Sequence, residues 1–326
     1  MLIVFHGDGT SPFAEGFARQ LEGNPDVRVL PEILADETDK QTYASADVIV
    51  TFKFNTECPR PEHLKLLHVP GTDCEGIDLT AVPSSAVICN CFGHEQAIAE
   101  YVMAAFLMHQ IPFGHADRNL RKAQWTYFAG PAAAVHGELT GRTAGLLGFG
   151  HIGRAVAERA KAFEMKVHVA NRTLVPVSDV VDRSFLLGDL RNFWPLLDFL
   201  VVALPLTTET RGIVDAEAFA SMRSTAVVVN VGRGPTIDEG ALFHALRDSR
   251  IAGATIDAWY NYPAKDSEKV FPSTLPFHEL QNVVMTPHMS AWTEGTIHRR
   301  QETIAINIGR CMRGESCVNV VRPASS

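Results

Sequence analysis

The sequence predicts an α/β protein of two doubly wound parallel-sheet domains, one inserted into the other. Three observations predict this class. Short apolar runs alternate with helical segments in two separate series along the chain. The runs of the second series are apolar throughout and rich in valine, as strands covered by helices on both faces must be. A length of 326 residues leaves room for about two domains.

The first series of predicted strands lies near the N-terminus, at residues 2–5, 27–30, 47–52, 64–69 and 86–90. Strands that repeat with helical spacers predict parallel βαβ units. After the first run, Ser11 and Pro12 precede FAEGFARQL. This predicts a helix with Ser11 as its N-cap and Pro12 at its first helical position.

The second series begins after residue 140, with runs at 143–149, 166–170, 198–205, 226–232, 254–259 and 282–288. Six such strands suffice for a complete doubly wound sheet.

Two long helical runs, 95–111 and 292–314, stand at the joins between the two series. The simplest arrangement returns the second helix to the first domain. We therefore expect a discontinuous domain of residues 1–94 and 290–326, and a continuous inserted domain of residues 95–289.

Composition excludes several classes of function. A net charge of −8 and a pI near 5.9 argue against a nucleic-acid surface, which needs clustered Lys and Arg. The start MLIVFHGDG lacks a basic region and predicts a strand, not a signal peptide, and no run is long enough to span a membrane. The six cysteines lack zinc-type spacing, so we expect reduced thiols, no metal and a cytoplasmic location.

A glycine pattern in the second series predicts a dinucleotide site. Gly148, Gly150 and Gly153 have G-x-G-x-x-G spacing between an apolar run and an amphipathic helical segment, which carries Ile152, Val156 and Phe163 on one face. The first glycine permits a tight turn, the second lets the backbone approach a pyrophosphate, and the third lets helix and strand pack closely. The helix N-terminus supplies N–H donors to the anion.

The next run ends in Ala170, Asn171, Arg172 and Thr173. A site for NAD places Asp or Glu near this point to hold the ribose 2′-hydroxyl. No carboxylate here repels a 2′-phosphate, and Arg172 can pair with one. The sequence therefore favours NADP(H) over NAD(H), with a solvated Arg172 of no role as the alternative.

Five motifs in order give the chain a resemblance to a known family. They are PGTDCEGID (70–78), ELTGRTAGLLGFGHIGRAVA (138–157), LPLTTETRGIV (204–214), VNVGRGPTIDEGAL (229–242) and TPHMSAWT (286–293). The chain resembles the D-isomer-specific 2-hydroxyacid dehydrogenases over nearly its whole length. The resemblance implies a Rossmann cofactor domain inserted into a flavodoxin-like substrate domain.

The resemblance also implies roles for particular residues. Arg233 would bind the substrate carboxylate and polarise the 2-oxo group, and His288 would be the general acid and base. Asp257 would contact the nicotinamide side of the cofactor, and the backbone at Thr72 and Asp73 would help hold the carboxylate. Further cofactor contacts are expected at His151, Ile152, Leu204, Pro205, Thr210, Val231, Gly232 and His288.

Elementary chemistry agrees with the two central roles. Arginine offers a planar fork for a carboxylate and keeps its charge. Reduction of a carbonyl consumes one proton, so a group that titrates near neutrality belongs at its oxygen. Alternatively, Arg233 only caps the following helix and His288 is an ordinary turn histidine. Either residue alone favours that alternative, whereas both together at strand ends favour catalysis.

Tyr262 departs from the family pattern, because it stands five residues after Asp257, where the family has a catalytic Glu. Three interpretations compete. Another carboxylate serves instead, the nearest in sequence being Glu294, Asp266 and Glu268. Or Tyr262 orients a neutral His288, which gives activity over a lower pH range. Or proton transfer is dispensable, as in formate-type relatives. We favour the second interpretation, with Trp259 and Tyr260 packing or lining the cleft.

Several other residues are weaker candidates for the substrate site. The family often has Asn where His94 falls, so His94 either faces the substrate or caps the following helix. Trp292 either walls the substrate site or is a core aromatic. Lys53 and Trp125 are, like Trp292, further candidates for the pocket.

The expected function is reduction of a small anionic 2-oxo acid to a D-2-hydroxy acid by NAD(P)H, or the reverse, in a homodimer built on the cofactor domains. One alternative is a formate- or phosphite-type dehydrogenase of the same fold. Another is a nucleotide-sensing binding protein of corepressor type, which would bind cofactor without turnover.

Overall fold

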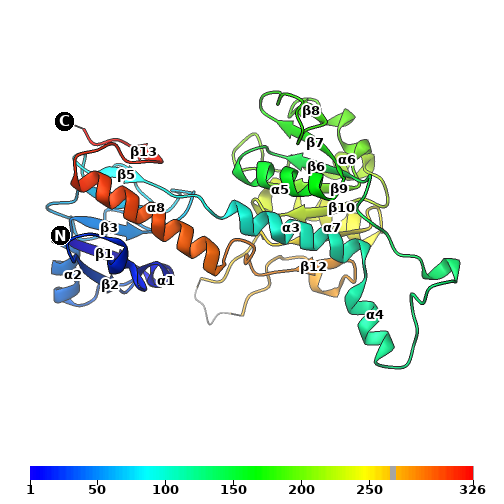
Figure 1. Cartoon of the computed structure of the whole chain (residues 1–326), viewed down its shortest axis with the longest axis horizontal. Coiled ribbons are helices and arrows are strands. Elements are labelled where there is room, and N and C mark those ends of the chain that lie inside the picture. The colour runs from blue at the N-terminus through cyan, green and yellow to red at the C-terminus, as the bar shows by residue number, and fades with distance from the viewer. Residues whose placement is uncertain (265–268, 326) are drawn as a thin grey trace. The chain divides into compact units, whose positions relative to one another are not determined.

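The computed structural model describes residues 1–264 and 269–325. The chain divides into two compact units, one of Met1–His94 with Trp292–Ser326 and one of Glu95–Ala291. We call them unit 1 and unit 2 and describe each by itself. Figure 1 labels their helices and strands.

Unit 2 is built on a parallel sheet whose strands run in the order β12-β11-β10-β9-β6-β7-β8. Chain order leaves β6 toward β7 on one side and returns to β9 on the other, the doubly wound pattern. The strands are β6 (Thr143–Leu147), β7 (Lys166–Asn171), β8 (Arg183–Leu186), β9 (Phe199–Val202), β10 (Val227–Asn230), β11 (Gly253–Ile256) and β12 (Val283–Met285).

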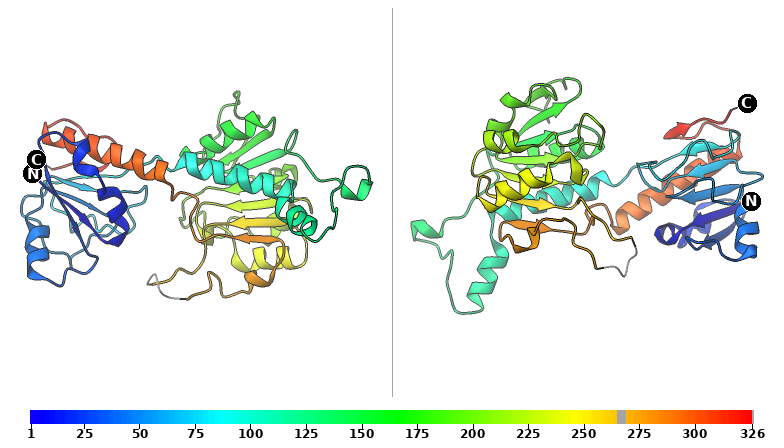
Figure 2. Two further views of the ribbon diagram at one scale, coloured as in Figure 1. Left: turned by 60° about the horizontal axis from the view of Figure 1, so that its bottom comes forward. Right: turned by 180° about the vertical axis from the view of Figure 1, so that it is seen from behind.

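Helices cover both faces of this sheet, and each face has its own core. On one face, apolar side chains of α3 (Glu95–Gln110) and α5 (His151–Ala162) pack against the strands. On the other face, α6 (Ala216–Ser221) and α7 (Glu239–Arg247) do so. Both layers can be followed in Figure 2. This double cover explains why the strands are apolar throughout.

The remaining helices of unit 2 are short. After α3 comes α4 (Phe113–Leu120), which stands away from the sheet in Figure 1. The single-turn helices are η3 (Ala132–Ala134), η4 (Leu190–Asn192), η5 (Trp194–Leu196), η6 (Gly234–Thr236) and η7 (Phe277–Glu279).

Unit 1 has a mixed sheet in the order β13-β5-β4-β3-β1-β2, with β13 antiparallel to β5 and the other pairs parallel. The strands are β1 (Leu2–His6), β2 (Asp26–Leu30), β3 (Val48–Thr51), β4 (Leu66–His68), β5 (Val87–Cys89) and β13 (Val320–Arg322). The prediction of two doubly wound α/β domains is confirmed.

Helices also cover both faces of the sheet in unit 1. Phe13 from α1 (Ser11–Ala14) and Ile304 and Ile308 from α8 (Glu294–Met312) pack on one face. Tyr43 from α2 (Glu37–Ala44) packs on the other. The single-turn helices are η1 (Asp8–Thr10) and η2 (Phe17–Gln20).

Two strands were missed by the sequence analysis. β8 extends the sheet of unit 2 to seven strands instead of six, and β13 adds an antiparallel edge to unit 1. Both are edge strands whose side chains are mostly exposed or half-buried. They therefore lack the continuous apolar run by which the central strands are recognised.

Two local predictions were wrong. The helix expected after Ser11 ends at Ala14, because Glu15 is extended and Gly16 has φ +68°, and its N-cap is Thr10. The side chain of Phe163, expected on the apolar face of α5, is 40% exposed at the helix C-cap. In both cases the helical period continues in the sequence past the point where the backbone leaves the helix.

In the part of the chain that the structure describes, no helix combines the length and apolarity needed to cross a membrane. All six cysteines are free thiols. No metal-binding group of three His, Cys, Asp or Glu side chains occurs among the described residues.

Candidate active site

The polar loops of unit 2 lie along one edge of its sheet, because all seven strands are parallel. Gly148, Leu204, Arg233, Asp257 and His288 follow the carboxyl ends of β6, β9, β10, β11 and β12 in turn. In open α/β sheets this edge is where ligands bind.

The three glycines of the first loop differ in what surrounds them. Gly148 has φ +103°, and a Cβ there would press on the backbone of Ala203. A Cβ on Gly153 would collide with the carbonyl oxygen of Gly148. At Gly150 no described atom lies within 4 Å of an added Cβ. Gly148 and Gly153 are therefore needed by the fold, whereas Gly150 leaves open space at the N-terminus of α5, where a phosphate fits.

The end of β7 carries the residues expected to select the cofactor. Asn171 is half-buried, and Arg172 and Thr173 are exposed. Glu209, in the loop after β9, accepts a hydrogen bond from the Thr207 hydroxyl at 2.7 Å, which with nearby Arg172 lowers the pKa of Glu209. A carboxylate from another loop thus acts electrostatically on Arg172, although the β7 end itself has none.

The loop after β9 is held in shape by its own threonines. The buried Thr210 hydroxyl donates to the carbonyl of Pro205 at 2.7 Å and accepts from the Thr207 N–H at 2.7 Å. Leu204 is buried beside Gly148 and Gly232. This loop therefore packs between the glycine loop and the Arg233 loop.

The backbone around Arg233 is fixed by close approaches that only glycine allows. A Cβ on Gly232 would press on Leu204, and a Cβ on Gly234 would collide with the carbonyl group of Trp259. Asn230, 1% exposed, accepts from the Gly232 N–H at 3.1 Å and donates to the Arg233 carbonyl at 3.3 Å. The loop is thus tied to its neighbours on both sides, and the half-buried Arg233 extends from a fixed backbone.

His288 sits in a strained turn that Asp257 holds. The backbone of His288 has φ +58°, a left-handed conformation unusual for a side-chain-bearing residue. The next two N–H groups, of Met289 and Ser290, donate to the Asp257 carboxylate at 2.8 and 2.9 Å. The Thr286 hydroxyl donates to the same carboxylate at 2.6 Å. Asp257 is 1% exposed, so its carboxylate is enclosed by the turn whose donors it accepts from.

Tyr262 and His288 are hydrogen-bonded. The Tyr262 oxygen lies 2.8 Å from His288 Nδ1 and accepts from the Trp259 N–H at 3.0 Å. Trp259 is buried, and its indole N–H donates to the Thr286 carbonyl at 2.8 Å. The same tryptophan therefore fixes both the tyrosine and the strand that leads to the histidine.

The charge state of Tyr262 follows from its surroundings. Partial burial raises the pKa of its hydroxyl, against opposing effects of the Trp259 N–H and the Arg233 guanidinium. Because that pKa starts near 10, the hydroxyl stays neutral at ordinary pH. It can donate to or accept from Nδ1, but it supplies no negative charge.

Comparison with known proteins identifies the family. The profile described as "D-isomer specific 2-hydroxyacid dehydrogenase, NAD binding domain" matches residues 103–290. This chain belongs to that family. The matched segment contains the glycine loop, Arg233, Tyr262 and His288, and it accounts for a nicotinamide dinucleotide as the cofactor.

Individual relatives are dehydrogenases and reductases. D-3-phosphoglycerate dehydrogenase of Methanocaldococcus jannaschii is 30% identical over 96% of this chain, which spans 58% of that relative's length. Glyoxylate reductase of Korarchaeum cryptofilum is 30% identical over 69% of this chain and 66% of its own length. An acyclic imino acid reductase solved with NADPH and D-Arg is 25% identical, with a TM-score of 0.76 over 98% of this chain and 100% of that one.

The substrate-binding residues predicted for this chain lie in unit 1. The Thr72 carbonyl accepts from Asn90 Nδ2 at 2.7 Å, and Asp73 is the next residue of the same loop. His94 is buried, with its ring stacked on Phe92. Trp292 is half exposed with its ring edge on Phe13. The substrate roles of Thr72, Asp73, His94 and Trp292 stay predictions.

The remaining candidates, Lys53 and Trp125, are exposed. Lys53 pairs with Glu32 at 3.8 Å, and Trp125 is exposed beyond α4. Among the alternative carboxylates, Glu294 is exposed in the first turn of α8, in unit 1. Asp266 and Glu268 lie outside the described residues. None of these observations selects one of them as a partner for His288.

Sequence reasoning missed the residues that support the site from behind. The Tyr101 hydroxyl lies 2.6 Å from the Thr286 hydroxyl, which donates to Asp257. Because the threonine proton is used on the carboxylate, Tyr101 is the donor to Thr286. Tyr101 belongs to α3, far from Thr286 in sequence, so only its place in a helix packed on this sheet could have indicated the contact.

We predict opposite effects for two glycine substitutions. Gly150→Ala should keep the free energy of unfolding within about 0.5 kcal/mol, because the new methyl enters open space, but should weaken NADPH binding by blocking close approach of the phosphates. Gly153→Ala should instead lower stability by about 2 kcal/mol or more, because its methyl meets backbone. Urea unfolding and fluorescence titration with NADPH measure the two effects. Unchanged NADPH affinity in Gly150→Ala would contradict the assignment.

We also predict that Asp257→Asn lowers the free energy of unfolding by about 2 kcal/mol and reduces kcat, because the amide turns an N–H donor toward groups that need acceptors. Asp198→Asn is the matched control. Asp198 is also buried and accepts from the Thr143 N–H and from Arg223, away from His288. It should lose similar stability and keep kcat. Equal kcat losses in both variants would show that Asp257 has no special effect on the histidine.

Proposed function

We propose that this protein transfers hydride between NADPH and a small 2-oxo acid, with a D-2-hydroxy acid as the product, or catalyses the reverse reaction. The observation that carries the proposal is the joint position of Arg233 and the Tyr262–His288 pair at the same edge of the sheet of unit 2. A cation that recognises a carboxylate and a group that titrates near neutrality are what this reaction needs.

The glycine loop supports a dinucleotide, since Gly150 opens onto free space at the start of α5. When bound, the nicotinamide supplies or accepts the hydride. In our proposal the guanidinium of Arg233 binds the substrate carboxylate and draws electron density from the 2-oxo group. This role fits a residue whose backbone is fixed between Gly232 and Gly234.

His288 would supply the proton. In our proposal Tyr262 holds Nδ1, and Nε2 donates to the carbonyl oxygen in reduction and accepts a proton in oxidation. Donation requires the imidazolium form, because a neutral ring that loses a proton becomes an unstable anion. A neutral tyrosine stabilises imidazolium less than a carboxylate would, so we infer that reduction is fastest in the acidic part of the usual histidine range.

We assign unit 2 as the cofactor domain and unit 1 as the substrate domain, with Thr72, Asp73, His94 and Trp292 as the unit 1 contributors. The named activities of the relatives include reduction of glyoxylate and of an imino acid, and oxidation of phosphoglycerate. The substrate class proposed here is their common chemistry, a small molecule with a carboxylate next to the reacting carbon.

A substrate panel tests the proposal. NADPH and NADH oxidation would be followed with glyoxylate, pyruvate and hydroxypyruvate, each with and without methylamine, across pH 5 to 9. Formate and phosphite with NADP+ form the opposing arm. We expect turnover with at least one 2-oxo acid, lost in Arg233→Ala. Turnover only with formate or phosphite would replace the proposed reaction, and cofactor binding without any turnover would favour a nucleotide-sensing protein.

We predict that Tyr262→Glu raises the pKa of His288 by about 1 unit and increases kcat/KM for reduction at pH 8 to 9 by up to about tenfold. Tyr262→Phe should lower the rate at every pH without moving the profile, because it removes the hydrogen bond and no charge. Tyr260→Phe is the control, since its hydroxyl donates to the Ile237 carbonyl at 3.2 Å. An unchanged pH profile in Tyr262→Glu would mean that Tyr262 does not act on the imidazole.

For cofactor selection we predict that Arg172→Ala raises KM for NADPH by about tenfold and leaves KM for NADH nearly unchanged. Glu209→Gln should lower KM for NADPH, because it removes a negative charge that acts on Arg172. Arg191→Ala is the control, an exposed arginine that lies near Glu217. If Arg172→Ala affects both cofactors equally, the 2′-phosphate assignment is wrong.

We further propose a homodimer formed through α4 and the segment after it. This part of unit 2 exposes Phe113, Trp125 and Phe128, each at least 58% accessible. Large exposed apolar side chains gathered on one projecting segment favour a protein partner, and a second copy is the simplest. Trp125→Glu with Phe128→Ser should give a monomer in sedimentation velocity. Val177→Ser, at another exposed apolar residue, should not. A dimer that survives the double substitution would contradict the proposal.

A further inference from the structure

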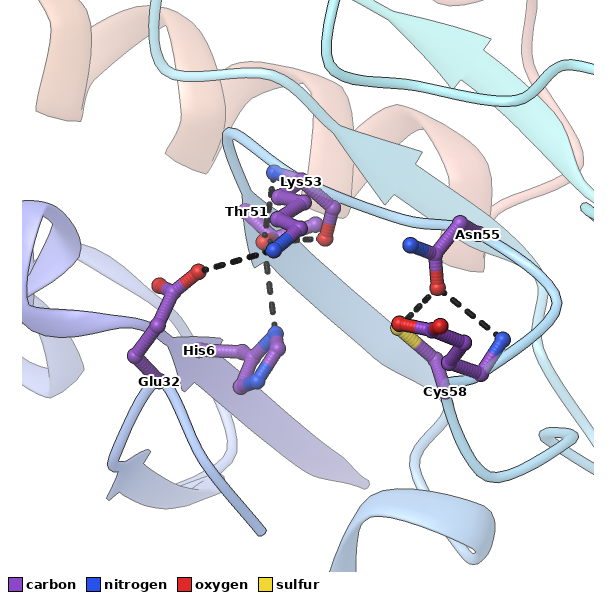
Figure 3. A network of polar contacts seen from close by, with 7 residues as sticks. His6, Glu32, Thr51, Lys53, Asn55 and Cys58 are labelled. Atoms are coloured by element: carbon purple, nitrogen blue, oxygen red, sulfur yellow. Dashed lines mark hydrogen bonds and ion pairs between the residues drawn. The ribbon is translucent and has the colours of Figure 1, made fainter. Parts of the chain in front are cut away.

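Unit 1 contains a hollow of about 520 Å3 that none of the proposed catalytic residues lines. It lies at the carboxyl ends of three neighbouring strands. His6 ends β1, Glu32 follows β2, and Lys53 follows β3, with Asn55 and Cys58 further along the same loop. In Figure 3, Lys53 points toward Glu32 above His6, and Asn55 and Cys58 form a second group beside them. The volume is in the range of small-molecule sites.

The position of the hollow in the sheet is typical of a ligand site. β1 pairs with β2 on one side and with β3 on the other, and the chain goes first to β2 and then to β3. The strand order therefore reverses at β1. In open α/β sheets, ligands bind outside the carboxyl ends of the strands at such a reversal.

A buried atom at this point lacks a partner. His6 is only 4% exposed, and its Nε2 has no hydrogen-bond partner among the described residues. Buried polar atoms are nearly always paired in folded proteins, by protein, water or ligand. Since the ring lines the hollow, a molecule inside it can provide the missing bond.

The hydrogen bonds of Thr51 indicate whether His6 Nε2 needs a hydrogen-bond donor or an acceptor. The Thr51 hydroxyl donates its single proton to the Lys53 carbonyl at 2.9 Å. Its contact with His6 Nδ1 at 3.4 Å therefore requires a proton on Nδ1. Burial lowers the pKa of His6, more than the Glu32 backbone and carboxylate raise it, so the ring is neutral at pH 7. Nε2 then carries a lone pair and needs a donor.

The charges around the hollow are balanced. Lys40, Lys53, Glu32 and Glu57 are among the residues that line it, and Lys40 also pairs with Glu37 at 2.6 Å. Lys53 and Glu32 are 3.8 Å apart and about half exposed, a loose pair that contributes little stability. Both ends can therefore re-pair with a ligand at small cost. Equal numbers of opposite charges favour a ligand that also carries one of each.

We propose that this hollow binds a small α-amino acid. Its ammonium group donates to His6 Nε2 and faces the Glu32 carboxylate, and its carboxylate pairs with Lys53. All residues that line the hollow belong to unit 1, and none of the proposed hydride-transfer residues is among them. The proposal does not depend on that function.

Isothermal titration calorimetry of the full-length protein with the twenty common amino acids tests the proposal. At least one should bind with millimolar or better affinity. The N-trimethyl derivative of that amino acid keeps both charges but has no N–H donor, and it should bind about tenfold or more weakly. Absence of binding by all twenty at 10 mM, or equal binding of the trimethyl derivative, would overturn the proposal.

Variants locate the site. His6→Phe and Glu32→Gln should each weaken binding about tenfold, and Glu32 is exposed enough that its change leaves folding intact. His63→Gln, at an exposed histidine of the same unit, is the control. Arg233→Ala should leave amino acid binding unchanged. If binding is lost in Arg233→Ala but kept in Glu32→Gln, the amino acid binds at the hydride-transfer site and this proposal is wrong. The proposed function would not be contradicted by that result.

Discussion

The candidate active site depends on one buried carboxylate. Asp257 accepts hydrogen bonds from Thr286, Met289 and Ser290, and these bonds hold His288 in a left-handed backbone conformation. Such a conformation costs on the order of 1 kcal/mol for a residue with a side chain, and a turn without external bonds would relax. The direction of the imidazole is therefore set by an aspartate on the neighbouring strand, and not by the histidine's own segment.

A second constraint is close packing between loops. Gly234 lies against the carbonyl of Trp259, Gly232 against Leu204, and Gly153 against Gly148. The first two contacts join loops that follow different strands, and the third packs the start of α5 against the glycine loop. The loops at this edge of the sheet therefore form one rigid assembly in which Arg233 and His288 keep a fixed relation. Fixed geometry of this kind is what a reaction that aligns a hydride, a carbonyl and a proton requires.

Within that frame, Tyr262 positions the imidazole through a hydrogen bond from a neutral hydroxyl. It occupies Nδ1 of His288, as a carboxylate would, but contributes no charge. Two supports, the half-buried Tyr101 through Thr286 and the buried Trp259 through Tyr262, converge on the same turn. This neutral partner at Nδ1 is the basis of the lower pH range that we propose for reduction.

The sequence by itself determined the fold class, the central strands and the glycine, arginine and histidine loops. These features follow from local rules, because buried parallel strands must be apolar and backbone that approaches a ligand or another loop must be glycine. The tertiary structure alone decided the rest. It showed that the carboxylate of Asp257 accepts the hydrogen bonds of the turn around His288. It also showed that Tyr101 hydrogen-bonds to Thr286 and that Glu209 lies near Arg172, although both pairs are far apart in sequence. It further showed that β8 and β13 complete the sheets as edge strands and that the helix after Ser11 ends at Ala14. These features share one physical reason. Each depends on contacts with a segment that is distant in sequence, and such contacts produce no periodic pattern of apolar residues in either segment.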